Sequence, residues 1–503
     1  MVLVFYSEKL PLSDQTVLKV KLTDFSSGMN TKLDTNILPL NVARNSYNFD
    51  FLTGALKTGM GFKDLMIPYS SESQKTMLVP EGVTAIRKMW LFNRWSNESN
   101  KFSPLIIIYT DGENGKEVYW SFLNTAVATF FLLEDVTFAK EPIGINLRTE
   151  GMDNFFWSPS QEGEFLTTWN GVDLPESHPT APIVTSFAYH ANRLFATIGG
   201  DKSQIWFSSD TDPTNWVATA FDGGYIELTD ERGTLNKAIS YNNYLYIIRE
   251  YGITRLSGSG EQSEFVVRNL SLSNSKIYAN TASLCGDKII MLCRDGLYSF
   301  DGMELSKITL GFESLLEGQD NSEACSAFLD GKYYLACKMS SNDYGEQAYS
   351  QMTNNCLVEF DVKTGEYSIL RGVDICALTA LQFGNISKLV ACFSGDYQNR
   401  LGELTHDGKV FGSATKKVWE SPYTDLGYPN KNKIIKSITL LNKYKSKIGI
   451  VIDGKTHLFD ISASANNAVK VPINLRGNVF AIGFYSETSD AYISNPQLEV
   501  NLE

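Results

Sequence analysis

The sequence lacks long apolar runs, and hardly any stretch shows apolar residues at helical spacing. A membrane-spanning helix needs about 20 consecutive apolar residues, and no stretch reaches that length. The apolar run at the start is short and has no basic residues before it, unlike a secretory signal peptide. We therefore expect a protein that folds in the cytoplasm and does not insert into a membrane.

Cysteine and histidine are scarce, with seven and four residues respectively. The cysteines all lie between Cys285 and Cys392, their number is odd, and no pair has CxxC spacing, so we expect no disulfide scaffold. The histidines lie far apart, which does not fit the close ligand spacing of a metal site. We expect buried, reduced thiols, no metal and no cofactor.

Motifs of catalysis are missing too, since neither a GxxxxGK[ST] phosphate loop nor a GxSxG motif occurs. One stretch, SSDTDPTNW from Ser208 to Trp216, resembles the Asp-box turn S-x-D-x-G-x-x-W of propeller glycosidases. Here Asp212 replaces the glycine, and the stretch occurs once where such enzymes repeat it. We predict no catalytic residues and a protein that is not an enzyme, with a propeller glycoside hydrolase as a distant alternative.

Acidic residues outnumber basic ones by 57 to 44, which gives a formal net charge of −13. A protein that grips nucleic acid normally presents a basic surface, so this balance argues against a DNA-gripping role, but not against a protein that lets DNA pass without sequence-specific binding. One lysine-rich stretch either meets an acidic partner, such as a neighbouring subunit or DNA, or forms the solvated face of a hairpin. Its residues are Lys431, Lys433, Lys436, Lys443, Lys445 and Lys447.

The sequence is rich in short apolar or alternating runs separated by Gly, Asn and Asp turns, which predicts an all-β chain. A repeat of 44 residues aligns the segment from Asn243 with that from Asp287, placing Gly252 on Gly296, and the next copy begins at Gly331. Such periods are typical of four-stranded propeller blades. We predict a β-propeller of about seven blades, with six or eight as alternatives, rather than two successive sandwiches.

After the connector Trp419–Gly427 the repeat stops and about six alternating strands follow, which predicts a C-terminal antiparallel β-sandwich. We therefore divide the chain into an N-terminal arm and ring-closing segment at 1–80, a propeller at 81–414 and a sandwich at 415–503. The glycine-punctuated stretch 18–62 is either an arm that reaches a neighbouring subunit or a strand that closes the propeller ring.

Residues 22–62 are similar to the N-terminal stretch of many virion proteins of tailed bacteriophages. That stretch runs roughly Phe-x-Gly-Gly-hydrophobic-Asn-Thr, then Ala-Arg-x-x-Asn and two spaced glycines, and Ser27 departs from it in place of the first glycine. The matching positions are Phe25, Gly28, Asn30, Thr31, Ala43, Arg44, Asn48, Gly54 and Gly61. Stretches that resemble the propeller of the same class are 205–216, 245–258 and 294–302. The segment 421–427 and the strands after it, ending at 493–500, resemble its C-terminal sandwich.

This class includes the tail nozzle proteins of short-tailed phages, also called packaged-DNA stabilisation proteins. The resemblance implies a virion protein that forms a homo-oligomeric ring of about six copies around the DNA channel, next to the portal and adaptor. It also implies that the ring retains packaged DNA and gates its ejection. In that interpretation, the candidate inter-subunit arm contains Phe25, Gly28, Asn30, Thr31, Arg44 and Asn48.

The main alternative is a phage tail-tip protein whose propeller binds a receptor or glycan. Four tryptophans, Trp95, Trp120, Trp157 and Trp169, occur close together and would suit a sugar-binding platform, although Trp more often packs in a core. Exposure of these rings is the feature that would favour this alternative.

Overall fold

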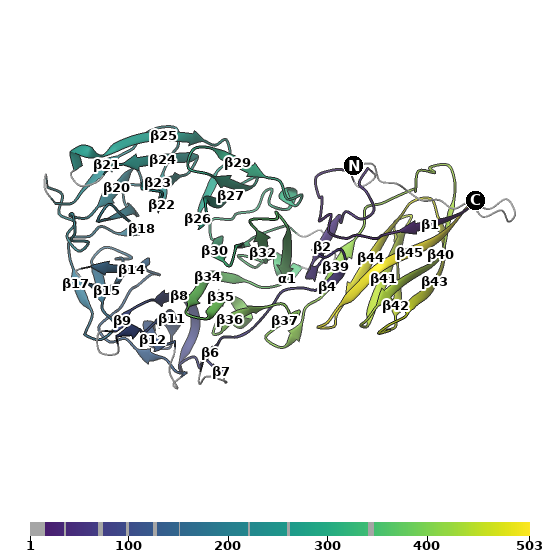
Figure 1. Ribbon diagram of the computed structural model, residues 1–503, viewed down its shortest axis with the longest axis horizontal. Helices are drawn as coiled ribbons and strands as arrows, with labels where there is room; N and C mark the ends of the chain where they lie inside the picture. Colours follow the sequence, from purple (N-terminus) through teal and green to yellow (C-terminus); the bar gives the residue numbers. More distant parts are fainter. Residues whose placement is uncertain are drawn as a thin grey trace.

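The computed structural model describes residues 16–34, 37–68, 74–96, 100–123, 128–149, 151–219, 222–258, 262–340 and 347–503. These residues are mostly β-structure, and the α-helix among them is the single turn α1 (Gln347–Ser350). The start of the predicted N-terminal segment, 1–15, lies outside the described residues. Figure 1 shows two bodies side by side, a ring of small sheets and a sandwich that contains the C-terminus.

Six antiparallel sheets of four strands and a seventh, larger sheet stand around a central axis, so the predicted all-β propeller of about seven blades is confirmed (Figure 1). Blades one to three consist of β8 (Val83–Phe92), β11 (Leu105–Gly112), β12 (Gly115–Phe122) and β13 (Phe131–Leu132); β14 (Gly144–Thr149), β15 (Met152–Trp157), β16 (Leu166–Trp169) and β17 (Glu176–His178); and β18 (Val184–His190), β19 (Arg193–Ile198), β20 (Gln204–Phe207) and β21 (Gly224–Glu227).

Blades four to six follow the same order of strands along the chain. They consist of β22 (Leu235–Tyr241), β23 (Tyr244–Arg249), β24 (Gly252–Ser257) and β25 (Val266–Leu272); β26 (Ile277–Cys285), β27 (Lys288–Cys293), β28 (Gly296–Phe300) and β29 (Leu305–Ile308); and β30 (Cys325–Leu329), β31 (Lys332–Cys337), β32 (Cys356–Asp361) and β33 (Tyr367–Arg371). Ser186 and His190 of β18 hydrogen-bond to Ala238 and Ser240 of β22, so the first strands of these two blades run in the same direction.

The seventh blade is built from both ends of the propeller sequence. Its strands β34 (Ile375–Phe383), β35 (Ile386–Phe393) and β36 (Leu401–Thr405) are followed by β5 (Gly61–Asp64), which comes from the N-terminal segment. β37 (Lys409–Val410) lies on the other side of β5 and pairs with β38 (Ser413–Ala414). The ring-closing interpretation is therefore confirmed for the last residues of the stretch 18–62.

The 44-residue repeat marks the second strands of blades four, five and six, which are β23, β27 and β31. These strands are buried on both faces except at their first residues, because each blade is sandwiched between two others. Cys293 and Cys337 are the last residues of β27 and β31, and both are fully buried. Their equivalent places in sequence therefore reflect one repeated core position.

The sandwich consists of two sheets that combine strands from both ends of the chain. The first has the order β3-β4-β45-β40-β43 with β1 also on β45, and the second has the order β2-β39-β44-β41-β42. Their strands are β1 (Thr16–Lys21), β2 (Asn45–Tyr47), β3 (Phe49–Asp50), β4 (Leu56–Thr58), β39 (Lys417–Glu420), β40 (Lys433–Asn442), β41 (Ser446–Ile452), β42 (Lys455–Ile461), β43 (Ala468–Gly477), β44 (Phe480–Ser486) and β45 (Tyr492–Leu502).

The predicted division at 414/415 agrees with the end of β38 and the start of β39. The predicted N-terminal unit 1–80 is instead divided, since β1 to β4 belong to the sandwich and β5 belongs to the propeller. The physical reason is that β45 has an open edge, and β1 and β4 supply the hydrogen-bond partners for it. Two short hairpins, β6 (Met66–Pro68) with β7 (Gln74–Thr76) and β9 (Trp95–Ser96) with β10 (Lys101–Phe102), complete the fold.

The sandwich joins the propeller at blade six through a continuous apolar core (Figure 1). Phe51 and Phe312 each pack edge-on against Tyr367 of β33, with ring centroids 6.1 and 5.2 Å away. The backbone N–H of Asn48 donates to Ile369 O at 2.8 Å across the same joint. Because this joint is apolar and hydrogen-bonded, we expect the two bodies to move as one.

Candidate binding surfaces and the central channel

The N-terminal positions that carry the family resemblance lie at the joint between the two bodies. Phe25 is fully buried, with its ring edge-on to Trp419 at 4.8 Å and to Phe484 at 5.9 Å. Gly28 has a φ of +73°, and the Tyr367 hydroxyl lies 3.5 Å from where a Cβ would stand. That hydroxyl accepts a hydrogen bond from the Met29 N–H at 3.1 Å.

The polar members of the same set make intramolecular hydrogen bonds. The backbone N–H of Thr31 donates to Gly311 O at 2.8 Å, and Asn30 Oδ1 accepts from the two backbone N–H groups that follow Thr31. Arg44 lies 3.3 Å from the Glu420 carboxylate. Asn48, at a φ of 62°, accepts from Arg371 N and donates to Lys416 O, both at 2.7 Å.

These contacts correct the idea of a free arm at Phe25, Gly28, Asn30, Thr31, Arg44 and Asn48. The residues pack and hydrogen-bond within their own chain, so they do not extend from it as a free arm. The glycine and asparagine positions at positive φ shape the turns of the joint. The glycine and asparagine pattern of this stretch predicted turns, but it could not show whether the stretch packs on the sandwich or on the propeller.

The lysine-rich stretch does not form one patch. Lys433 is fully buried and donates to Tyr428 O, whereas Lys443 and Lys445 are exposed in the turn after β40. β40 separates Lys433 from this turn by about 30 Å, since a strand rises about 3.3 Å per residue. Lys431 is exposed before β40, and Lys436 on β40 and Lys447 on β41 are half-buried. A partner-binding role stays a prediction for these lysines, and we call the turn 443–447 the lysine turn.

The Asp-box-like stretch forms a structural turn. Trp216 is buried and its indole N–H donates to Pro213 O at 2.9 Å. Asp212 accepts hydrogen bonds from the backbone N–H and the hydroxyl of Thr214. Both aspartates of the stretch, Asp210 and Asp212, are exposed, so the turn holds its loop in place without forming an acid–base pair in a cleft.

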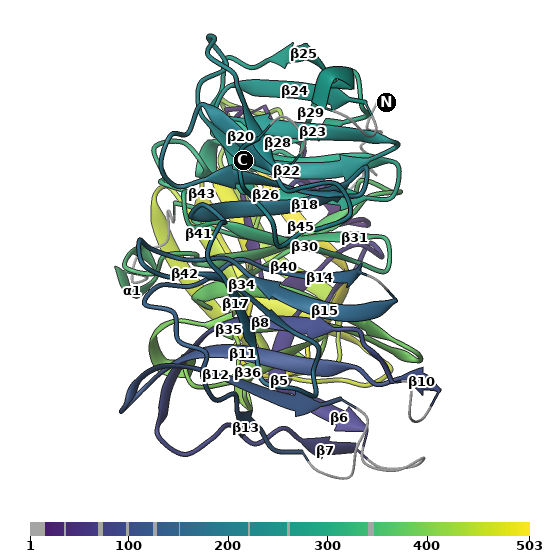
Figure 2. The same ribbon diagram turned by 90° about the vertical axis from the view of Figure 1, so that its left-hand side faces the viewer.

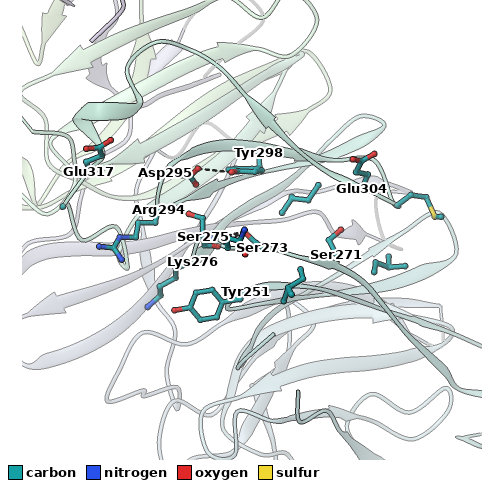
Figure 3. A pocket seen from close by; sticks show the side chains of 16 residues that line it. Tyr251, Ser271, Ser273, Ser275, Lys276, Arg294, Asp295, Tyr298, Glu304 and Glu317 are labelled. Atoms are coloured by element: carbon teal, nitrogen blue, oxygen red, sulfur yellow. Dashed lines mark hydrogen bonds between the residues drawn. The ribbon is translucent and has the colours of Figure 1, made fainter. Parts of the chain in front are cut away.

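An open groove of about 1170 Å³ lies between blades four and five (Figure 3). Tyr298 donates to the Asp295 carboxylate at 3.0 Å, and Lys307 lies 2.6 Å from the same carboxylate, which holds the pKa of Asp295 below its usual value against the effect of burial. Figure 3 shows Arg294 and Glu304 at separate places along the groove. Within the described residues, no group of three or more His, Cys, Asp and Glu side chains is arranged to hold a metal ion.

Charged groups from several blades meet near the central axis. Lys88 of blade one lies 3.0 Å from Glu141, in the loop before blade two. Burial lowers the pKa of Lys88, but the ion pair with Glu141 outweighs this effect and raises it above the usual value. Lys237 of blade four donates to Ala282 O of blade five at 2.7 Å, and burial, followed by the charge of Lys88, lowers its pKa to about 8. This cluster fastens neighbouring blades together.

One face of the propeller carries a group of exposed apolar side chains. In each blade the first and third strands end at this face, because neighbouring strands are antiparallel. The exposed fraction reaches 75% at Val172 and 69% at Leu174. Among the described blades and their loops, Phe165 and Leu272 are the large apolar residues exposed at the opposite face. We call the first surface the apolar face; its exposed members are Phe102, Phe131, Leu132, Met152, Val172, Leu174, Tyr189, Val217, Tyr225, Val266, Val267, Leu284 and Met303.

Figure 2 shows the propeller from the side, with β10 at the apolar face and α1 at the opposite face.

The four tryptophans between Trp95 and Trp169 are divided between core and surface. Trp157 and Trp169 are buried, whereas Trp120 is half-buried, with its ring 5.2 Å from that of the exposed Phe131. Trp95 is also half-buried and packs edge-on against the exposed Phe102 at 5.1 Å. The apolar face therefore includes aromatic surface on blade one.

Comparisons with known proteins identify no family for this chain. No protein-family model matches the chain, and no curated protein matches it. Solved structures that match include BBS1N in complex with ARL6DN, soaked with mercury (TM-score 0.40, 9% identity, covering 69% of this chain and 97% of that chain) or with lead (0.39, 8%, 68% and 96%). Another is the extracellular domain of the putative hybrid two component system BT4673 from B. thetaiotaomicron (0.32, 11%, 90% and 56%). Likenesses this weak say nothing about function.

No helix in the described part of the chain is both long and apolar enough to cross a membrane.

Proposed function

We propose that the chain is a structural protein of a tailed phage particle, in the tail nozzle or neck. About six copies would form a ring around the DNA channel, retain the packaged DNA and gate its exit. The observation that carries this proposal is where the phage-like motif lies in the fold. Its matching positions run from Phe25 to Gly61. Those up to Gly54 lie at the joint between propeller and sandwich, and Gly61 lies in the strand that closes the propeller ring.

The motif positions are tied to this architecture by steric demands. A Cβ at Gly61 would lie 2.1 Å from Lys409 O, and a Cβ at Gly54, whose φ is +77°, would lie 3.0 Å from the Asp24 carboxylate. These two motif positions therefore leave no room for a larger side chain at the joint and the ring closure. This supports the resemblance as one of architecture, and the function is proposed from it by analogy.

The physical properties suit such a role. The closed ring of blades protects strand edges from unwanted pairing. The net charge of −13 would repel DNA phosphates over about 8 Å at physiological salt, so that DNA slides past without sticking. In this proposal the partners are further copies of the chain, the portal and adaptor or other tail proteins, and DNA in passage. Assembly takes place in the host cytoplasm.

Antibody labelling of phage particles from the source, viewed by electron microscopy, tests this proposal. Label at the neck or nozzle of each particle is the expected result, and label at the distal tip would transfer the assignment to the tail-tip alternative. Particles without label would overturn both. If the ring is then resolved, an inner wall dominated by Lys and Arg would contradict the idea of unhindered DNA passage.

The second candidate function is binding of a receptor or glycan at a tail tip. The aromatic part of the apolar face, with Trp120 beside Phe131 and Trp95 beside Phe102, favours it, since exposed rings stack on sugars. A glycan array with the purified chain tests this function. Binding that is lost in Trp120→Ala but kept in Phe165→Ala, a change on the opposite face, would support it.

A further inference from the structure

We propose that the apolar face of one copy binds the lysine turn of a second copy. This inference rests on the proposed ring and names the two surfaces that would build it. Both surfaces are exposed in the single chain, and they differ in charge.

The apolar face has the character of a docking surface. Its members extend over five consecutive blades, and several exceed half exposure, including Met303 at 65% and Val266 at 58%. On blade one, Phe102 packs on Trp95 and Phe131 packs on Trp120, and exposed apolar patches mark interaction sites. The chain's own sandwich leaves the face open, because it joins blade six through Asn48 and Arg371 and meets Gly311 in a loop at the opposite face.

The face is also acidic. In blades one to five, the described loops of this face expose seven carboxylates, and the exposed cations beside them include Lys101 and Arg148, which lies 3.3 Å from Asp153. These carboxylates are Asp173, Asp210, Asp212, Glu264, Asp287, Asp301 and Glu304. A partner for this surface would need cationic groups around an apolar contact.

The C-terminal part of the chain meets that need. Residues 415–503 carry 11 Lys and Arg against 8 Asp and Glu, a net charge of +3, whereas residues 1–414 carry 33 against 49, a net charge of −16. Charge of opposite sign on two parts of one chain favours contact between copies and disfavours contact between like parts.

Within the C-terminal part, the lysine turn has the right shape and composition. Tyr444 is 41% exposed and stands between Lys443 and Lys445, so one aromatic anchor is flanked by two ammonium groups. The turn is preorganised, because Asn442 donates to Tyr444 O at 2.7 Å and accepts from the Ser446 hydroxyl at 2.8 Å. Preorganisation lowers the entropy lost on binding.

Two different surfaces of the same chain meet in this contact, so it is heterologous. Such a contact repeats from copy to copy and closes into a ring where the rotation allows it. This is the symmetry that a ring of identical subunits around DNA requires.

The experiment uses the full chain and three double variants. Val172→Asn with Leu174→Asn removes apolar contact from the apolar face, and Lys443→Glu with Lys445→Glu reverses the charge of the lysine turn. Phe165→Asn with Leu272→Asn is the matched control for the face variant, because it makes the same change at exposed apolar sites on the opposite face. All six positions are exposed, and circular dichroism would verify that each variant folds.

Mass photometry and sedimentation over a range of concentrations provide the readout. We expect the natural chain and the control to associate, and each surface variant alone to associate about tenfold or more weakly. The face variant loses apolar burial, and the turn variant brings acids against an acidic face. An equal mixture of the face and turn variants should form 1:1 dimers that grow no further, because each supplies the surface that the other lacks.

Three outcomes would overturn the inference: a natural chain that stays monomeric, surface variants that associate like the control, or a mixture that forms no dimers. Particle labelling separates these failures from failure of the proposed function. Label at the neck with unaffected surface variants would mean a virion ring built through other surfaces.

Discussion

Phe25 and Trp419 come from opposite ends of the chain and meet edge-to-face, with ring centroids 4.8 Å apart. Both rings are fully buried, so this pair locks the N-terminal segment onto the sandwich. We expect Phe25→Ala to lower the free energy of unfolding by about 3–5 kcal/mol, through lost burial and the cavity it leaves. Urea denaturation measures the change.

Leu33→Ala provides the control for this variant, since Leu33 lies in the same segment but is 49% exposed. Its effect should stay within about 0.5 kcal/mol. If Phe25→Ala lowered the free energy of unfolding as little as Leu33→Ala, the segment would not contribute to the core.

Closure of the propeller ring depends on Gly61. A Cβ there would lie 2.1 Å from Lys409 O, where β5 lies between β36 and β37. Gly61→Ala should therefore cost about 1–3 kcal/mol and speed amide hydrogen exchange in β36, because the strand must move aside. Hydrogen exchange with mass spectrometry reports this site directly.

Gly200→Ala is the matched change, since a Cβ at Gly200 has no atom within 4 Å and its φ is not positive. Exchange in β36 should stay unchanged in that variant. Unaltered exchange in Gly61→Ala as well would show that β5 is not needed to hold blade seven.

The sequence was most informative where structure repeats locally. The equivalence of Gly252 and Gly296 predicts successive blades, because blades one to six are each folded from one continuous stretch of chain. The place of β1 to β4 was not predictable, since they pair with strands far away in sequence and no local pattern encodes such a partner.

The candidate sites show the same limit. Lys433 and Lys443 look alike in the sequence, but the first is buried and the second exposed, and strand length alone sets them apart. The apolar face had no sequence signal either, because Val172 and Met303 come from different blades and become neighbours of one surface only when the ring closes.

Stability at high pH depends on Lys237. Its pKa falls from 10.5 to about 8 in the fold, so the unfolded chain binds more protons between these values, and stability rises as pH increases from about 8 to 10.5. Lys237→Met should lack this rise while remaining folded. Urea denaturation at neutral and alkaline pH compares the two slopes.

Other groups that titrate in this range, such as Lys417, are present in both proteins and cancel in the comparison. Parallel pH dependence in the two proteins would show that the Lys237 ammonium is solvated like that of a surface lysine.

The thiols offer a test of core packing that needs no assay of function. All seven cysteines are thiols, and burial raises the pKa of Cys376 to about 11 and that of Cys285 to about 12. Because the thiolate is the reactive form, a disulfide reagent at neutral pH should react slowly with the folded chain. Cys376 should react first, since it is half-buried, and its pKa is raised less than that of Cys285.

Cys376→Ala should remove this first phase of the reaction, and Cys293→Ala should keep it. In denaturant all seven thiols should react at once. Fast reaction of several thiols in the folded chain would show that the blades open at neutral pH.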